Sequence, residues 1–279
     1  MFKLPVICLL LLPFTFITAK EAKPLYEWGV VGGVARTPHY PAAADSSTYY
    51  LTFPSFIYRG LTFRNDDKGF RARFLTTTNL DLDLSFGGSF PADSEDNKAR
   101  SGMDDLDLLL EFGPRLSYIL HKNNGHEWEI ELPLRYVFST DFNFTSHRGY
   151  RLQPQLDYRY KFFEYFILSM GYKLNYATEK LSDYFYEVDD KDIIPNIRER
   201  YNASAGYIGQ DLSVSFMVRY FKFFGIIGVR TSQYHDASNE ESPLFKSREN
   251  SSTFIAFNYF FYASEEKAPK NKYLRTPTQ

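Results

Sequence analysis

Residues 127–138 read EWEIELPLRYVF and alternate between polar and apolar side chains. The apolar positions are Trp128, Ile130, Leu132, Leu134, Tyr136 and Phe138, and the charged positions between them are Glu127, Glu129, Glu131 and Arg135. Successive side chains of a β-strand point to opposite faces. This stretch therefore predicts a strand with one apolar face and one charged face.

The same period of two recurs along the chain and persists unusually far. It is seen in residues 70–86, 105–120, 152–160, 166–176 and 212–220, in runs of up to 17 residues. Strands of soluble sheets average about 5–6 residues, whereas a strand that crosses a bilayer takes about 9–11. Tyr and Phe gather near the ends of the apolar faces, as in the aromatic girdles of membrane barrels. The pattern favours a membrane barrel over a soluble sandwich.

We therefore predict an all-β fold, a transmembrane antiparallel up-and-down β-barrel in the outer membrane. About ten strands are expected, at 26–34, 48–64, 69–90, 105–120, 127–139, 150–160, 165–177, 211–220, 224–234 and 252–262. An even number leaves both termini in the periplasm. Twelve strands are the alternative, because residues 184–186 and 201–206 could pair as two more.

Short and long connections alternate between these strands. The short ones are expected at 65–69, 121–126, 161–164 and 221–223, and the long ones at 35–47, 91–104, 140–149, 178–210 and 235–251. Outer-membrane barrels have short periplasmic turns and longer extracellular loops. The short turns are therefore expected to face the periplasm.

Charge and hydropathy exclude two other classes of protein. The 32 basic and 34 acidic residues give a formal net charge of −2, so there is no basic surface to attract nucleic acid. The mean hydropathy is −0.37, and the longest uncharged run, residues 4–19, is shorter than the ~20 residues of a spanning helix. A polytopic helical membrane protein is therefore excluded.

The first 19 residues predict a signal peptide. Lys3 is followed by an apolar run that ends at Ala19, so the mature chain is expected to start near Lys20. Cleavage would remove Cys8, the single cysteine, and with it any disulfide or cysteine metal site. The expected organisation is a signal peptide at 1–19, a barrel at 20–262 and a polar periplasmic tail at 263–279.

Charged residues on the inward faces of neighbouring strands form a predicted ladder. Its members are Arg71, Arg73, Asp81, Asp83, Asp105, Asp107, Glu111 and Arg115. The interior of a small barrel is filled by side chains, so these charges are expected to neutralise one another and plug the lumen. The alternatives are a narrow channel for small solutes and, since carboxylates are paired here, glycosidase chemistry on murein.

The histidines provide little support for an enzyme. His39, His121, His126, His147 and His235 all fall in predicted turns or loops, and none lies in mid-strand on the lipid face beside a serine, as a lipase dyad would. We predict no catalytic, metal-binding or cofactor-binding residues and a non-enzymatic protein. A membrane-embedded hydrolase is a third hypothesis, for which the sequence nominates no nucleophile.

Short motifs spread along the chain carry a family resemblance. They are Pro38-His39-Tyr40, Pro54 with Tyr58-Arg59-Gly60, residues 100–106 around Gly102 and Met103, Glu111-Phe112-Gly113-Pro114, and the acidic loop 236–244 with Ser242 and Pro243. In this order and spacing they resemble the MipA/OmpV family of outer-membrane proteins. One departure is that such barrels usually end at an aromatic residue, whereas here residues 263–279 follow Phe261-Tyr262.

The resemblance, and not the composition, implies a function. The family's namesake is similar to a scaffold that couples a murein lytic transglycosylase to a bifunctional penicillin-binding protein in peptidoglycan remodelling. Both enzymes are therefore expected partners, besides outer-membrane lipid. Other members are linked to adhesion, osmotic response or antibiotic susceptibility, so an adhesion or stress-response barrel is a further alternative.

Overall fold

The computed structural model describes residues 23–66, 69–163 and 165–269 of the chain. The expected signal peptide at 1–19, with Cys8, lies outside the described residues, as do residues 270–279 of the expected tail. No helix in the described part is long and apolar enough to cross a membrane.

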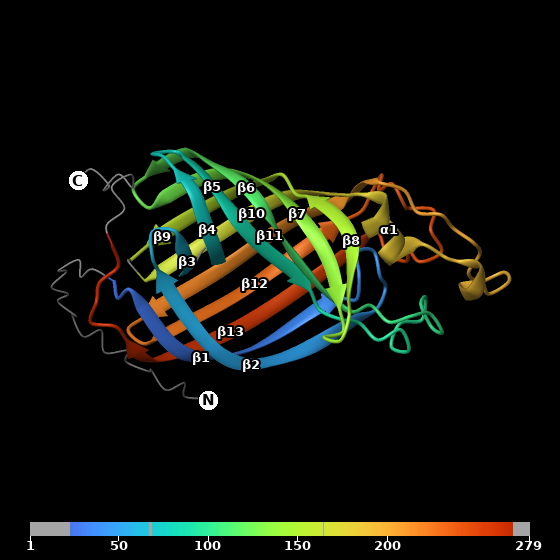
Figure 1. The fold of residues 1–279 in the computed structure, drawn as a ribbon, viewed down its shortest axis with the longest axis horizontal. Helices are drawn as coiled ribbons and strands as arrows, with labels where there is room; N and C mark the ends of the chain where they lie inside the picture. The colour runs from blue at the N-terminus through green and yellow to red at the C-terminus, as the bar shows by residue number, and fades with distance from the viewer. Residues whose placement is uncertain (1–22, 67–68, 164, 270–279) are drawn as a thin grey trace, which may run out of the picture.

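The described chain is almost entirely β-structure (Figure 1). The strands are β1 (Tyr26–Pro38), β2 (Ser46–Arg59), β3 (Phe63–Asp66), β4 (Gly69–Thr76), β5 (Leu80–Ser89), β6 (Leu108–Asn123), β7 (His126–Thr140), β8 (Thr145–Leu152), β9 (Gln155–Phe162), β10 (Phe166–Ala177), β11 (Gly206–Tyr220), β12 (Phe223–Gln233) and β13 (Glu249–Ala263). One α-helix, α1 (Glu179–Tyr186), and a 3-10 turn, η1 (Asp190–Asp192), lie between β10 and β11.

The strands close into an antiparallel barrel of twelve. Each strand pairs with the next along the chain, except that β8 and β9 do not pair with each other, and β1 also pairs with β13. β8 and β9 count as one strand, because both lie between β7 and β10 and are separated only by Gln153 and Pro154. Proline has no N–H to donate to a ladder, which accounts for the interruption.

The twelve-strand alternative is therefore correct and the expected ten is wrong, but the extra strands come from an unexpected place. The expected strand 48–64 divides at residues 60–62 into β2 and β3, and the expected strand 69–90 divides at 77–79 into β4 and β5. Residues 184–186 belong to α1 instead of a strand, and residues 201–205 contribute only an isolated bridge, Tyr201 with Val188.

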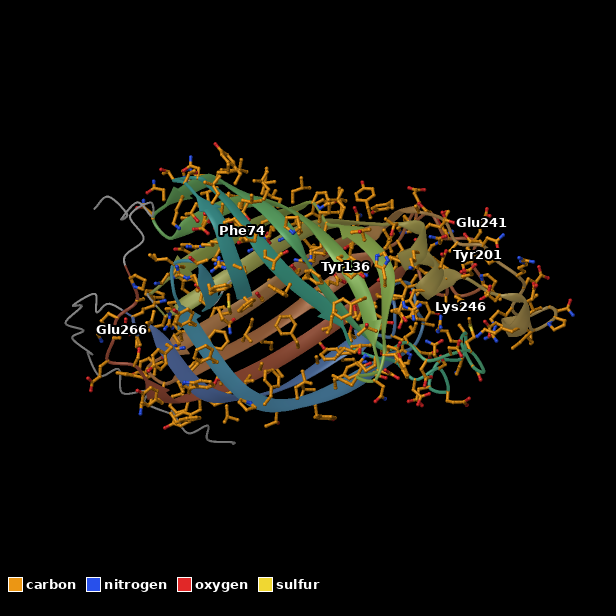
Figure 2. The ribbon with its side chains drawn as sticks, viewed as in Figure 1. Phe74, Tyr136, Tyr201, Glu241, Lys246 and Glu266 are labelled. Carbon is orange, nitrogen blue, oxygen red and sulfur yellow. The ribbon has the colours of Figure 1, made fainter. Side chains whose placement is uncertain are left out.

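The outer wall of the barrel is apolar. The exposed and buried positions alternate strictly over residues 109–118 of β6 and 127–134 of β7, and Leu116, Leu132 and Ile130 are among the exposed ones. Figure 2 shows Phe74 and Tyr136 on the outside of this wall. Strands of a barrel hydrogen-bond to one another within the wall, so an apolar outer face can contact lipid.

The two ends of the barrel differ. One, here called the turn end, has the short turns 60–62, 77–79, 124–125 and 221–222, residues Phe163 and Tyr165, and both ends of the described chain. The other, here called the loop end, has α1 and the long connections 39–45, 90–107, 178–205 and 234–248. Glu241 and Lys246 lie at the loop end and Glu266 at the turn end (Figure 2).

The β3–β4 hairpin is too short to fill the wall between its neighbours. β2 pairs with β1 along its whole length, but with β3 only at Tyr58 and Arg59. On the far side, β5 pairs with β6 from Leu80 to Ser89, but with β4 only from Asp81 to Ser85. Among the described residues, the loop-end halves of β2 and β5 therefore have no strand between them, as Figure 1 shows.

Candidate functional site in the lumen

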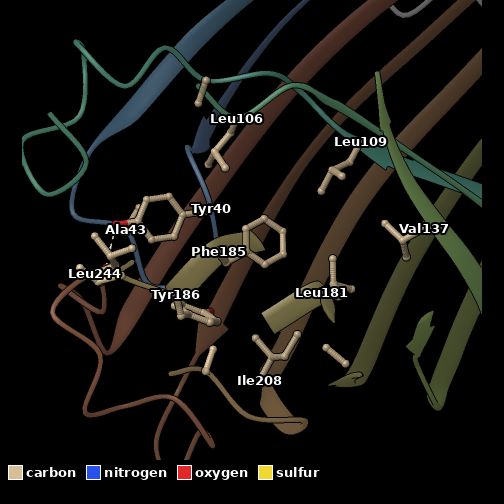
Figure 3. Close-up of a cluster of buried hydrophobic side chains, with 14 residues drawn as sticks. Tyr40, Ala43, Leu106, Leu109, Val137, Leu181, Phe185, Tyr186, Ile208 and Leu244 are labelled. Carbon is tan, nitrogen blue, oxygen red and sulfur yellow. Dashed lines mark hydrogen bonds between the residues drawn. The ribbon is translucent and has the colours of Figure 1, made fainter. Parts of the chain in front are cut away.

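A hydrophobic plug fills the loop end of the barrel (Figure 3). It is built on α1, whose Leu181, Phe185 and Tyr186 are buried. They pack in one cluster with residues from four connections and from strand ends, including Tyr40, Ala43, Leu106, Leu109, Val137, Ile208 and Leu244. The plug therefore brings together segments that are far apart in the sequence.

Hydrogen bonds fix the plug in place. The Tyr40 hydroxyl donates to the Leu244 carbonyl at 2.7 Å, and the Ser242 hydroxyl donates to the Tyr186 carbonyl at 2.7 Å. The Tyr186 hydroxyl donates to the Pro41 carbonyl at 3.0 Å. Of the two motif residues, Ser242 therefore binds the end of α1 directly, whereas Tyr40 joins two of the loop-end connections that surround it.

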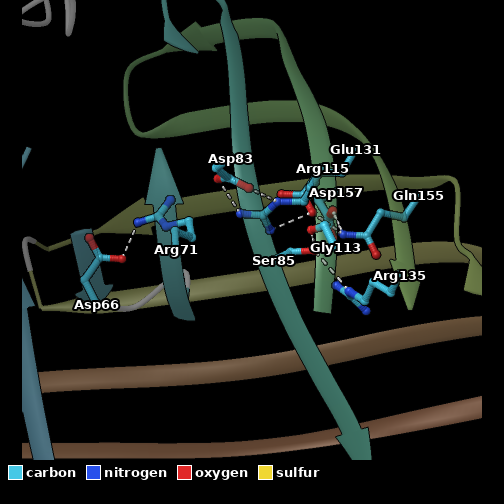
Figure 4. A network of polar contacts seen from close by, with 10 residues as sticks. All are labelled: Asp66, Arg71, Asp83, Ser85, Gly113, Arg115, Glu131, Arg135, Gln155 and Asp157. Carbon is cyan, nitrogen blue, oxygen red and sulfur yellow. Dashed lines mark hydrogen bonds and ion pairs between the residues drawn. The ribbon is translucent and has the colours of Figure 1, made fainter. Parts of the chain in front are cut away.

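Below the plug, ion pairs cross the barrel interior (Figure 4). Arg115 on β6 binds both carboxylate oxygens of Asp83 on β5, at 3.0 and 2.8 Å, and Glu131 on β7 at 3.0 Å. All three residues are buried. A guanidinium between two carboxylates satisfies the charge that burial would otherwise leave uncompensated.

A second group of ion pairs lies nearer the loop end. Glu111 on β6 receives Arg151 at 2.8 Å and lies 3.7 Å from Arg135. Arg135 also donates to the Ser85 hydroxyl at 3.0 Å and to the Gln153 side chain at 2.8 Å. Together the two groups connect β5, β6, β7 and β8 inside the barrel.

The structure brings together only part of the ladder named from the sequence. Asp83, Glu111 and Arg115 lie inside as described. Arg71 pairs with Asp66 at 2.5 Å, and Asp81 and Arg73 each bury a polar atom that has no hydrogen-bond partner among the described residues. Asp105 and Asp107 lie elsewhere, because β6 begins at Leu108.

Those two acids belong to the connection before β6. Asp105 accepts a hydrogen bond from the Ser94 amide at 2.7 Å, and Asp107 is 4.0 Å from Arg148. Their alternation with Leu106 continues that of β6, although the strand itself has not begun. Because of this continued alternation, the expected ladder included Asp105 and Asp107, although both lie before the first residue of β6.

Two cavities of opposite charge lie in the lumen. The outer cavity, about 540 Å³, lies beneath Tyr40 and Phe185 and is lined by basic residues Arg36, Arg135, Arg151, Lys173 and Arg230 and acidic residues Glu111 and Asp211. The inner cavity, about 200 Å³, is lined by acidic residues Glu127, Glu129, Glu131 and Asp157 and basic residues Arg115 and Arg159. The outer cavity is therefore predominantly basic and the inner one predominantly acidic.

Most other motif residues shape the backbone. Gly113 lies where β6 and β7 approach so closely that a Cβ would be 2.0 Å from the Leu134 carbonyl. Gly102 has φ +80°, a left-handed conformation that glycine adopts without strain. Gly60 begins the β2–β3 turn against the Tyr58 ring, and Arg59 forms a buried salt bridge with Glu27. Met103 packs against the plug.

The prolines of the motifs lie in different parts of the fold. Pro38 ends β1 and lines the outer cavity. Pro54 lies in β2, Pro114 lies in β6, and Pro243 lies in the connection before β13.

The histidines and acids do not form a metal site within the described part of the chain. No group of three or more His, Cys, Asp or Glu residues there could hold a metal ion. His39 contacts the Ser47 hydroxyl at 2.8 Å and the Asn97 side chain at 3.0 Å, and both contacts hold loop-end connections together. His126 stacks on Tyr160 with ring centroids 4.1 Å apart.

Several lumen residues were not selected from the sequence. Glu131 and Arg135 were recognised as the polar face of a strand, but their partners could not be paired with them. Lys173, Asp211 and Arg230 lie on strands whose polar faces are interrupted by Ser and Gly. The signal that could identify them is the strand register, which aligns Lys173 with Asp211.

A closed twelve-strand barrel with an apolar outer wall and a plugged, charged lumen defines an outer-membrane type of protein. The family model described as "MltA-interacting protein MipA" matches residues 30–261, so the chain belongs to the MipA family. The family and the fold support a non-enzymatic barrel. No curated protein matches the chain.

Solved outer-membrane structures resemble the chain in fold only. The COG4313 outer-membrane channel from Pseudomonas putida F1 is 12% identical, with a TM-score of 0.40, over 88% of this chain and 100% of that one. OmpT of Vibrio cholerae is 7% identical, with a TM-score of 0.38, over 85% and 97% of the two chains. Likeness at this level transfers no function.

Proposed function

We propose that this protein is a non-enzymatic scaffold in the outer membrane that binds a murein lytic transglycosylase at the turn end of the barrel and couples it to a bifunctional penicillin-binding protein. The observation that carries the proposal is the family match over residues 30–261, whose name refers to interaction with the transglycosylase MltA. In this orientation the turn end faces the periplasm, where murein lies, because periplasmic turns are the short ones.

The turn end offers exposed aromatic side chains to such a partner. Phe163 and Phe221, in two separate turns, are 79% and 77% exposed. Exposed aromatic residues are frequent anchors of protein interfaces. The described residues of the expected contact regions at 121–126, 161–164 and 221–223 overlap turns of this end, whereas residues 65, 66 and 69 lie at the opposite end of the short β3–β4 hairpin.

The backbone of these two phenylalanines supports a role outside the fold. Phe163 has φ +48° and Phe221 has φ +49°. Bulky residues rarely adopt this left-handed conformation, which glycine and asparagine tolerate far better. The turn between β6 and β7 uses Asn124-Gly125 in such a conformation, as short hairpins usually do. Two phenylalanines in strained turn positions are therefore best explained by a contact that they make.

The tail lies beside these turns. Residues 264–268 run antiparallel to the start of the described chain, with the Leu25 amide donating to the Glu266 carbonyl at 2.7 Å and the Ala268 amide to the Lys23 carbonyl at 2.8 Å. This pairing orders part of the expected tail at the turn end. It adds to the surface that a periplasmic partner would meet.

The test compares Phe163→Asn and Phe221→Asn with a matched change in a third turn, Asn124→Asp. Binding of each barrel, in detergent, to a purified MltA-type lytic transglycosylase is measured by surface plasmon resonance. The double phenylalanine variant should bind at least about tenfold more weakly, since such anchors dominate interface energies. Its free energy of unfolding should be unchanged or higher, because strain is removed. Equal binding by wild type and double variant, or none by wild type, contradicts the proposal.

A further inference from the structure

The barrel wall is open between β2 and β5. The opening is bounded at its turn side by the β3–β4 hairpin and at its loop side by Tyr49, whose ring stacks on Phe90 at 4.4 Å. Phe53 shares the inward face of β2 with Arg59 and yet is 51% exposed. Unpaired strand edges are tolerated at membrane depth only where they border a cavity. The outer cavity does reach β5 here, from Phe86 to Phe90.

An apolar path leads inward from this opening. Strand register aligns six inward-facing residues in one row from β2 to β10, namely Leu51, Gly33, Ala256, Ile226, Met217 and Ile167. Interiors of membrane barrels are usually polar. On the loop side of this row, Phe254 lies over Gly228 and lines the outer cavity. The row thus provides an apolar surface that begins at the open edge.

Two basic side chains lie beyond the apolar row. Lys173 and Arg230 line the outer cavity, and neither forms a salt bridge with a described carboxylate. The lining carboxylates are outnumbered: Glu111 holds Arg151, and Asp211, which also accepts hydrogen bonds from Ser232 at 2.7 Å and Asn175 at 3.2 Å, lies opposite Lys173 in the register. An excess of cations over carboxylates in a recessed cavity favours an anionic ligand.

We propose that the outer cavity binds a single-chain anionic amphiphile, of the long-chain carboxylate class, which enters from the lipid between β2 and β5. Its carboxylate would lie between Lys173 and Arg230, and its chain would leave the cavity past Phe254 and continue along the apolar row. The cavity volume of about 540 Å³ falls within the range of roughly 300–1,000 Å³ typical of small-molecule sites. This inference is independent of the proposed scaffold function, since it concerns the interior and not the turns.

The test measures binding of radiolabelled palmitate to the barrel in phosphatidylcholine nanodiscs. We expect saturable binding of one palmitate per barrel, weakened at least about tenfold in Arg230→Gln and in the double variant with Lys173→Gln, because each loses a charge that pairs with the carboxylate. Phe53→Gln should also weaken binding. The matched controls are Arg159→Gln, in the inner cavity, and Phe56→Gln, on the outer face of the same strand. Both should bind as wild type.

Competitors separate this ligand from others. Hexadecanol, which lacks the charge, and hexanoate and inorganic phosphate, which lack the chain, should each compete poorly. Equal competition by any of them overturns the proposal, as does unchanged palmitate binding in Arg230→Gln. A dimer in the nanodisc that buries β2 also overturns it, since a second copy would then fill the opening.

The route of entry is tested with single introduced cysteines. They can be labelled selectively, because Cys8 is the single cysteine of the sequence. A bulky maleimide on Leu51→Cys, which faces inward, should slow palmitate uptake at least about tenfold, while the same label on outward-facing Thr52→Cys should not. Equal uptake by the two labelled proteins contradicts entry through the wall. Folding of every variant is checked by its heat-modifiable migration.

Discussion

Charged side chains in this barrel are held by partners on neighbouring strands. Arg115 illustrates this best, because it joins Asp83 and Glu131 across three strands at 2.8 and 3.0 Å. Each carboxylate alone would be costly to bury, so the three groups depend on one another. The sequence shows that these residues face inward, but only the register shows which charges meet.

Removing the shared cation should therefore destabilise the barrel strongly. Arg115→Ala leaves two buried carboxylates unpaired, and we expect a loss of about 3–5 kcal/mol in the free energy of unfolding. The measurement is urea unfolding in lipid vesicles. Lys191→Ala is the control, because its pair with Asp104 is 60% and 87% exposed and should contribute at most about 1 kcal/mol. Similar losses of unfolding free energy in Arg115→Ala and Lys191→Ala would contradict the prediction that the buried ion pairs matter more than the exposed one.

A second prediction at the residue scale concerns the contact at Gly113. A Cβ there would lie 2.0 Å from the Leu134 carbonyl, so Gly113→Ala must push β6 and β7 apart. Overpacking of this kind costs about 1–3 kcal/mol. Gly32→Ala serves as control, since its Cβ would meet nothing closer than 4.0 Å. If Gly113→Ala unfolds at the same urea concentration as Gly32→Ala, the close approach is not a constraint on this barrel.

Among the elements, the β4–β5 hairpin shows why the strand count could not be predicted from periodicity. The hairpin pairs Thr76 with Asp81, so an even-numbered residue of β4 faces the same side as an odd-numbered residue of β5. By itself, this pairing would exchange the inward and outward positions between the two strands. A bulge between Arg73 and Leu75 reverses it again. Residues 70–86 therefore read as one continuous strand, although two antiparallel strands are present.

Helix α1 was missed for a different reason. Residues 184–186 are apolar aromatics and resemble a strand, but Leu181 and Phe185 are four apart and both face the plug. That spacing is helical, and Ser182 and Tyr186 repeat it. Eight residues are too few for the period to stand out from sequence alone. The motif residues Tyr40 and Ser242 indicated the right neighbourhood without showing that they contact a helix.

The plug should be more stable at mildly acidic pH. Burial and the nearby carboxylates of Glu187, Glu179 and Asp189 raise the pKa of Asp183 on α1 to about 6. An exposed aspartate has a pKa near 3.9, so the docked helix binds a proton more tightly than the undocked one. Docking should therefore strengthen as pH falls from about 7 toward 4 and weaken again as it rises through 6.

Hydrogen exchange at the Leu181 amide, corrected for its intrinsic rate, measures this docking. Exchange should slow between pH 7 and pH 5 in the wild type and change less in Asp183→Asn. Asp141→Asn is the control, because backbone hydrogen bonds from Phe144 and Asn143 lower the pKa of that loop aspartate and keep it charged over this range. A wild-type rate that is independent of pH would contradict the assignment.

For the whole molecule, the plug and the lumen charges together oppose free passage of solutes. We expect wild-type barrels in planar bilayers to show no steady conductance, because the plug fills the loop end. Replacing Leu181 and Phe185 by Asp should undock α1 and produce discrete openings. Steady wild-type conductance would revive the narrow-channel alternative.

The overall architecture followed from the sequence more readily than the interior did. The long alternations predicted the class of fold, and the short motifs predicted the family. The model of that family matches residues 30–261. The interior depends on contacts between strands distant in sequence, such as Arg59 with Glu27 and Lys173 beside Asp211. No local pattern encodes such a register when one strand is bulged or interrupted.

The most direct test of the scaffold account is photo-crosslinking in living cells. A photoreactive amino acid is placed at Lys222, in an exposed turn at the turn end, and separately at Glu241, at the loop end. We predict that position 222 crosslinks to a lytic transglycosylase or to a bifunctional penicillin-binding protein and that position 241 crosslinks to neither. Crosslinks to these enzymes from position 241 alone, or from neither position in a correctly assembled barrel, would contradict the account.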